Sequence, residues 1–205
     1  MERWRVEITP SLVTGLIAVA FSIYFLIIFR ADLSIVAASI YFTLACTTDT
    51  FKSKIPNLLN GCLLVAGVII NTMDAGFHGF LLSLAGLALG IGLLLLPYLM
   101  GGLGAGDVKA LGALGALIGP YDLLHVFVYM GLYGGGIALL HFLYQANLKK
   151  AFREMWLSVC ASALTQKTQY IFPPAPKSGK GSLRFPYSAA IALGYYSFIY
   201  WGNVL

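Results

Sequence analysis

The sequence predicts an all-α fold, a polytopic bundle of about six to seven transmembrane helices, and three observations support this. Hydrophobic residues make up 59% of the 205 residues, only 10% are charged, and the mean hydropathy is +0.83. A typical soluble domain is about one-quarter charged, so the composition excludes a water-soluble globule. Apolar stretches of roughly the length that crosses a bilayer recur along the whole chain. We expect a single integral-membrane domain over residues 1–205.

Long and short apolar stretches alternate along the chain. The long ones cover residues 11–29, 33–50, 79–100, 123–146 and 187–204, and the short ones cover 58–72 and 103–119. From Lys109 to Gly119 the chain is too short to cross about 30 Å of hydrocarbon at about 1.5 Å per residue. That helix must therefore begin upstream, near Leu103, or the bilayer must be thinner there. Close helix packing is predicted by GxxxG pairs at 86/90, 115/119 and 131/135.

Basic residues predict the orientation of the chain in the membrane. The net charge is +5, and cytoplasmic loops of membrane proteins carry an excess of lysine and arginine. If the segment Lys52–Asn57 is cytoplasmic and the spans alternate, only Arg30 among the basic residues falls outside. We therefore expect a multi-pass protein of the plasma (inner) membrane, with its N-terminus inside and the lipid bilayer as a partner. No basic stripe interleaved with aromatics is present, so we expect no nucleic-acid partner.

The only extended polar segment covers residues 147–186. Its first half, Asn147–Thr165, is predicted to form an amphipathic helix at the cytoplasmic interface, and its second half has the proline and glycine content of a loop. The three cysteines form no CxxC pair, and histidines and cysteines do not cluster. We therefore expect no metal ion and no cofactor.

Two carboxylates lie close to the predicted membrane-spanning segments. Asp49 ends the apolar run 33–50 at its cytoplasmic side, and Asp107 follows a glycine-rich stretch. Ionisable groups are costly in such places, so both are candidates for function. The plain alternatives are a helix-terminal charge that reaches water for Asp49 and a helix N-cap for Asp107.

The predicted topology brings Asp49 and Asp107 to the same face of the membrane. Two carboxylates that share a site cannot both ionise cheaply, so one stays protonated near neutral pH. Such a pair suits aspartyl-type hydrolysis, in which one carboxyl group accepts a proton from water and the other donates one. Two other functions stay open at this point. One is a proton- or cation-coupled transporter that depends on the two carboxylates, and the other is a non-catalytic subunit of a secretion machine.

Three motifs resemble those of the prepilin peptidases, a family of GxGD-type intramembrane aspartyl proteases. They are Asp49 followed by Ile55-Pro56-Asn57, the segment Gly104-Ala105-Gly106-Asp107-Val108-Lys109, and the late segment Phe185–Gly194. The chain looks most like the short TadV/CpaA-like form of tight-adherence (Flp) pilus systems. The resemblance runs from about residue 40 to 200. Archaeal preflagellin peptidases share the two aspartates and the size, and remain an alternative.

The resemblance implies removal of the short basic leader from type IV (Flp-type) prepilins or pseudopilins at the cytoplasmic face. Asp49 and Asp107 would be the catalytic pair, Gly104 and Gly106 would leave room for the substrate backbone, and Lys109 would orient Asp107. The implied substrate-binding residues are Gly104, Gly106, Lys109, Pro56 and Asn57. Pilus or secretion assembly components would be further partners. Larger members also methylate the new N-terminus and carry paired CxxC motifs, which are absent here, so we expect no N-methyltransferase activity.

Overall fold

A computed structural model describes residues 10–29, 31–52, 54–99, 103–144 and 187–202. Within these ranges the chain forms α-helices and no strand, which confirms the predicted all-α bundle. The predicted interfacial helix and loop at 147–186 lie outside the described residues. The helices are α1 (Pro10–Ile28), α2 (Leu33–Lys52), α3 (Asn57–Leu99), α4 (Ala105–Ile118), α5 (Pro120–Tyr144) and α7 (Tyr187–Trp201).

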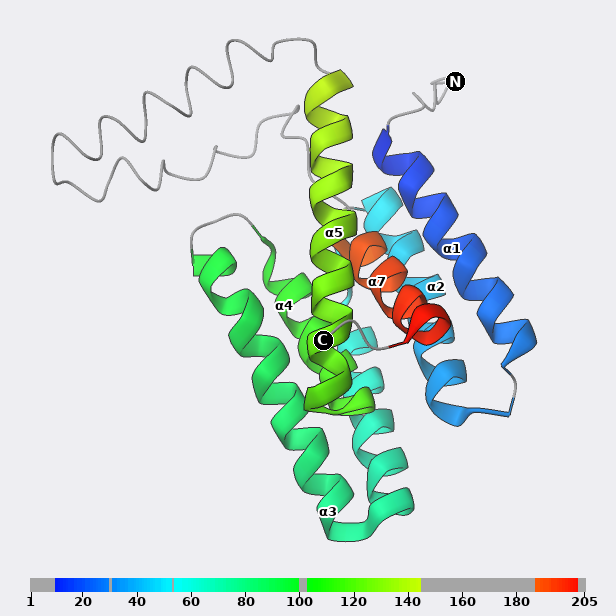
Figure 1. The fold of residues 1–205 in the computed structure, drawn as a ribbon, viewed down its shortest axis with the longest axis vertical. Coiled ribbons are helices and arrows are strands. Elements are labelled where there is room, and N and C mark those ends of the chain that lie inside the picture. The colour runs from blue at the N-terminus through cyan, green and yellow to red at the C-terminus, as the bar shows by residue number, and fades with distance from the viewer. Residues whose placement is uncertain (1–9, 30, 53, 100–102, 145–186, 203–205) are drawn as a thin grey trace, which may run out of the picture.

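Helix α3 combines two of the predicted stretches, 58–72 and 79–100. The helix breaks only at Ala75 (φ −129°, ψ 16°) and Gly76 (φ 58°, ψ −138°). Glycine fits the second position because it has no side chain to clash at positive φ. The two arms fold back on each other at this kink (Figure 1). The prediction of two helical stretches is therefore confirmed for the arms, and the turn between them consists of Ala75 and Gly76 alone.

Glycine and proline also set the ends of the later helices. Gly119, with φ 83°, ends α4, and Pro120 begins α5 earlier than the predicted residue 123. Proline suits the first position of a helix because that position needs no amide donor. Helix α4 has 14 residues, which at about 1.5 Å per residue is only about 21 Å. Helix α7 ends at Trp201, before Gly202 with φ 79°.

The outer surface of the bundle is apolar. Leu58, Met73 and Phe77 are each more than 70% exposed. In water such side chains would be buried, whereas hydrocarbon solvates them well. A search of the described residues finds two helices long and apolar enough to cross a membrane, Leu33–Phe51 and Asn57–Leu99, and a shorter apolar helix, Leu12–Ile28. The surface and the helix lengths together indicate a membrane-embedded bundle.

Among the described residues, helices α3 and α4 have the most extensive contact of any helix pair. The backbones of Gly86 and Gly115 touch directly, and a Cβ atom added to Gly90 would lie 2.6 Å from the carbonyl oxygen of Leu111. Small residues allow this approach, as predicted for two of the GxxxG pairs. At the third pair, 131/135, an added Cβ atom would meet none of the described residues within 4 Å, and close packing there stays a prediction.

The ends of four helices gather at one end of the bundle. Helix α2 ends there, and α3, α4 and α7 begin there (Figure 1). Contacts between these ends are direct, because Asn60 of α3 bonds Gly106 of α4 and Ser188 of α7 bonds Asp49 of α2. The fold therefore brings together four segments that are far apart in the sequence.

Replacing Gly86 with alanine should destabilise the protein. The new methyl group would collide with the backbone of Gly115, and overpacking of this kind costs about 1–3 kcal/mol of unfolding free energy. Gly92→Ala is the matched control, since a Cβ atom there meets nothing within 4 Å. Thermal melting in detergent should show a lower midpoint for Gly86→Ala alone. Equal midpoints for the two variants would contradict the tight α3–α4 contact.

Candidate active site

Asp49 lies in the last turn of α2 and is tied to α7. The hydroxyl group of Ser188 donates a hydrogen bond of 2.6 Å to Oδ2 of Asp49. Ser188 itself is 2% exposed. The short distance is typical of a hydroxyl bound to a carboxylate. Asp49 thus faces a neighbouring helix inside the bundle, and the alternative of a terminal charge that only reaches out to water does not describe it.

Asp107 is the third residue of α4 rather than its N-cap. Gly104 occupies the N-cap position, and its backbone N–H donates to Oδ2 of Asp107 at 3.1 Å. The alternative interpretation of Asp107 as the N-cap is therefore wrong by one helical turn. A carboxylate in the first turn is favourable because the backbone N–H groups there have no helical partners and carry partial positive charge.

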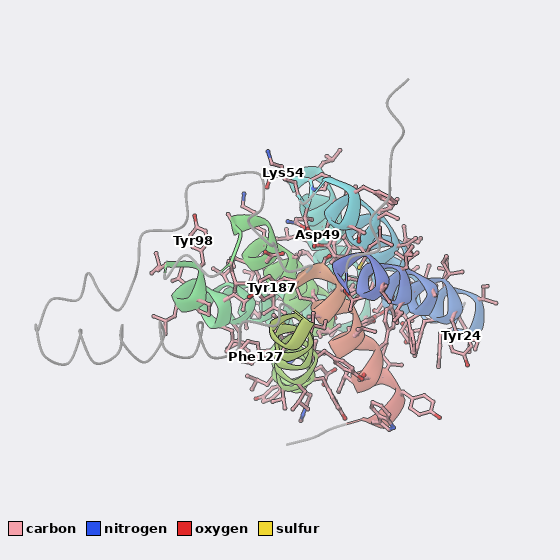
Figure 2. The ribbon with its side chains drawn as sticks, turned by 90° about the horizontal axis from the view of Figure 1, so that it is seen from above. Tyr24, Asp49, Lys54, Tyr98, Phe127 and Tyr187 are labelled. Carbon is pink, nitrogen blue, oxygen red and sulfur yellow. The ribbon has the colours of Figure 1, made fainter. Side chains whose placement is uncertain are left out.

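The two aspartates share one neighbourhood. The hydroxyl group of Tyr41 lies within electrostatic range of both Asp49 and Asp107. Tyr187 lies within electrostatic range of Asp107, and its neighbour Ser188 binds Asp49. Figure 2, which looks along the bundle from its upper end, shows Asp49 and Tyr187 near the centre. Two residues from separate helices therefore connect the surroundings of the two carboxylates.

Asn60 also connects the two helices that carry the aspartates, α2 and α4, and the sequence did not predict this role. The Tyr41 hydroxyl donates to Oδ1 of Asn60 at 2.6 Å, and Nδ2 of Asn60 donates to the carbonyl oxygen of Gly106 at 3.1 Å. Asn60 is 4% exposed. The sequence contains an indication of it, because a polar side chain inside an apolar membrane helix is costly and marks a functional candidate. Ser188 was also missed, although it lies within the late motif.

Two of the implied substrate-binding residues pair with each other. The ammonium group of Lys109 donates to Oδ1 of Asn57 at 3.0 Å. Pro56, the neighbour of Asn57, begins α3 by accepting hydrogen bonds at its carbonyl oxygen from the N–H groups of Leu59 and Asn60. The Pro56-Asn57 turn thus sets the start of α3 and, with it, the place of Asn60. Binding of substrate by these residues stays a prediction.

The two glycines of the motif differ in their surroundings, since Gly106 lies against Ile55 and Gly104 is exposed. A Cβ atom on Gly106 would lie 3.5 Å from Cβ of Ile55, and one on Gly104 would lie 3.2 Å from Oδ2 of Asp107. A side chain at Gly104 would therefore press on the carboxylate. Room for a substrate backbone at these glycines stays a prediction. In the part of the chain that the structure describes, no three His, Cys, Asp or Glu residues group as metal ligands would.

Comparison with known proteins identifies the family. A model of the type IV leader peptidase family matches residues 36–139, half of the chain. The chain belongs to this family. The resemblance to the prepilin peptidases is confirmed, and the protein is a membrane peptidase whose substrates are of the prepilin type. No curated protein and no solved structure matches the chain.

The family match covers both aspartates, Tyr41, Asn60 and the Gly104–Lys109 segment, but it ends before α7. Ser188, whose hydroxyl group donates to Asp49, therefore lies outside the matched segment. In this type IV leader peptidase, α7 completes the surroundings of a carboxylate that α2 carries.

Ser188→Ala should lower the rate of leader removal by about tenfold or more, because a hydrogen bond to a charged group contributes about 1.5–3 kcal/mol. Ser188→Thr, which keeps the hydroxyl group, should retain more activity. The matched control is Ser197→Ala, which removes a hydroxyl group bonded to Tyr133 farther along α7. Initial rates with purified protein and a prepilin substrate test this. Equal rates for Ser188→Ala and Ser197→Ala would show that the bond to Asp49 does not matter.

Proposed function

We propose that this type IV leader peptidase is an aspartic endopeptidase whose catalytic pair is Asp49 and Asp107. It removes the short basic leader from Flp-type prepilins or pseudopilins. The observation that carries the proposal is the shared neighbourhood of the two carboxylates, which come from α2 and α4 and both lie within electrostatic range of Tyr41. Asp32 and Asp122 both lie within electrostatic range of Tyr195 in the same way, but neither belongs to the three motifs shared with the prepilin peptidases.

The pair performs hydrolysis by general acid–base catalysis. One carboxylate is ionised and takes a proton from a water molecule as the water oxygen attacks the scissile carbonyl carbon. The other carboxyl group is protonated and donates its proton to the carbonyl oxygen, so that a neutral tetrahedral intermediate forms. Collapse of this intermediate breaks the C–N bond, and the proton taken from water passes to the leaving amine. As the carbonyl group re-forms, the other carboxylate takes back a proton from a hydroxyl group of the intermediate. The pair thereby returns to a state with one shared proton.

The active site opens to the cytoplasm in this proposal. Alternating spans with the N-terminus inside place the end of α2 and the starts of α3, α4 and α7 on the cytoplasmic side, where the basic segments also fall. The apolar outer surface of the bundle supports several crossings. The form is the short TadV/CpaA-like one, and its activity is peptidase activity alone, because the 205 residues contain no CxxC pair.

Replacing either aspartate with asparagine should abolish leader removal, with a loss of at least about 100-fold, since an amide can neither accept nor donate the required proton. Asp74→Asn is the matched control, because Asp74 is exposed beside the kink of α3. Cleavage of a co-expressed Flp-type prepilin, read as a mobility shift with equal insertion of all variants, measures the effect. Normal cleavage by either variant would rule out the aspartyl mechanism with this catalytic pair.

The orientation can be tested with single cysteines at Lys54 and Asp74. Both residues are exposed, and they lie before and at the end of the first arm of α3. In a variant whose native cysteines are replaced by alanine, a membrane-impermeant maleimide added to whole cells should label position 74 and leave position 54 unlabelled. Labelling of position 54 alone would reverse the proposed orientation.

A further inference from the structure

We propose that Asn60 is a positioning residue that sets the spacing between Asp49 and Asp107 by bridging the two helices that carry them. The inference rests on the proposed function for its catalytic meaning, but the spacing itself can be measured without activity. Asn60 belongs to α3, which carries neither aspartate.

Both polar ends of the Asn60 side chain are used, each by a different helix. Its Oδ1 atom accepts from the hydroxyl group of Tyr41 on α2 at 2.6 Å, and its Nδ2 atom donates to the carbonyl oxygen of Gly106 on α4 at 3.1 Å. Only an amide of this size accepts at one end and donates at the other. At 4% exposure, neither bond can be replaced by bulk water.

The two anchors of the bridge are coupled to the aspartates through rigid backbone. Tyr41 and Asp49 are eight residues apart on α2, so they lie about 80° apart around the helix and about 12 Å apart along its axis. Gly106 directly precedes Asp107. A displacement of either anchor therefore moves the corresponding carboxylate with it.

The bridge is needed because α2 and α4 have little direct contact, whereas α3 packs extensively on α4. Among the residues that the structure describes, no glycine contact like that of α3 and α4 fixes α2 relative to α4. One path from one carboxylate to the other through the described backbone runs from α2 to α3 to α4, and Asn60 provides its hydrogen bonds. A second path runs through α7, which Ser188 joins to Asp49.

Asn71 offers a matched control on the same helix. Its Nδ2 atom donates to the carbonyl oxygens of Ala116 at 3.0 Å and Leu117 at 2.9 Å, at the other end of α4. Asn71 thus also fastens α3 to α4 through an amide, but far from the aspartates. Loss of Asn71 should disturb helix packing without changing the spacing of the pair.

The test is cross-linking of the two aspartate positions in membranes. Asp49→Cys and Asp107→Cys are combined in the full chain, with Cys46, Cys62 and Cys160 replaced by alanine, and treated with bifunctional thiol reagents of increasing length. Asn60→Leu should lower the yield with the shortest effective reagent several-fold and favour a longer one. Asn71→Leu should leave the length profile unchanged. Identical profiles for Asn60→Leu and Asn71→Leu would overturn the proposal.

If Asn60→Leu does not insert, Tyr41→Phe replaces it, because it removes a single hydroxyl group and one of the two bonds. A profile shifted to longer reagents supports the bridge, and an unchanged profile overturns it. With the native aspartates present, Asn60→Leu should lower kcat and leave KM nearly unchanged, whereas an equal loss in Asn71→Leu would argue against positioning. Because the cross-linked variants lack both carboxylates, their profiles stand even if the aspartyl mechanism fails.

Discussion

The direct backbone contact between α3 and α4 is the constraint on which the rest of the structure depends. In a membrane the hydrophobic effect does not drive helices together, so close packing must provide the attraction. Gly86, Gly90 and Gly115 remove the side chains that would keep the two helices apart. On the first arm of α3, Gly67 approaches the backbone of Leu117 in the same way, and this contact places the start of α4 beside the start of α3. Only at this distance can the side chain of Asn60 reach the carbonyl oxygen of Gly106.

Several polar groups around the aspartates are joined between helices, whereas others, such as Ser22, bond a carbonyl oxygen of their own helix. Tyr41, Asn60 and Gly106 connect three helices, and Ser188 connects a fourth to Asp49. Unpaired polar groups would be expensive in this environment, so each bond both satisfies a buried group and fixes the position of a helix. The surroundings of the two aspartates are therefore part of the structural framework of the bundle, and the same contacts stabilise the fold and define the site.

The family match and the architecture divide the site into two parts. Residues 36–139 contain both aspartates and the bridge between their helices. Helix α7 lies beyond the match. It adds Ser188, whose hydroxyl group donates to Asp49, and Tyr187, which lies within electrostatic range of Asp107. In a chain of this size, the last helix thus serves the site as well as the bundle. Leader removal by this type IV leader peptidase would then depend on a residue that the matched segment does not include.

The sequence by itself determined the all-α membrane bundle, most helix ranges and the two candidate aspartates, because hydropathy and motif spacing are local properties of the chain. It did not determine the kinked α3, where Ala75 and Gly76 alone make the turn. The partners Asn60 and Ser188 were decided only by the tertiary structure. Each bonds a residue at least 46 positions away, and no local pattern encodes which distant helices a membrane bundle brings into contact.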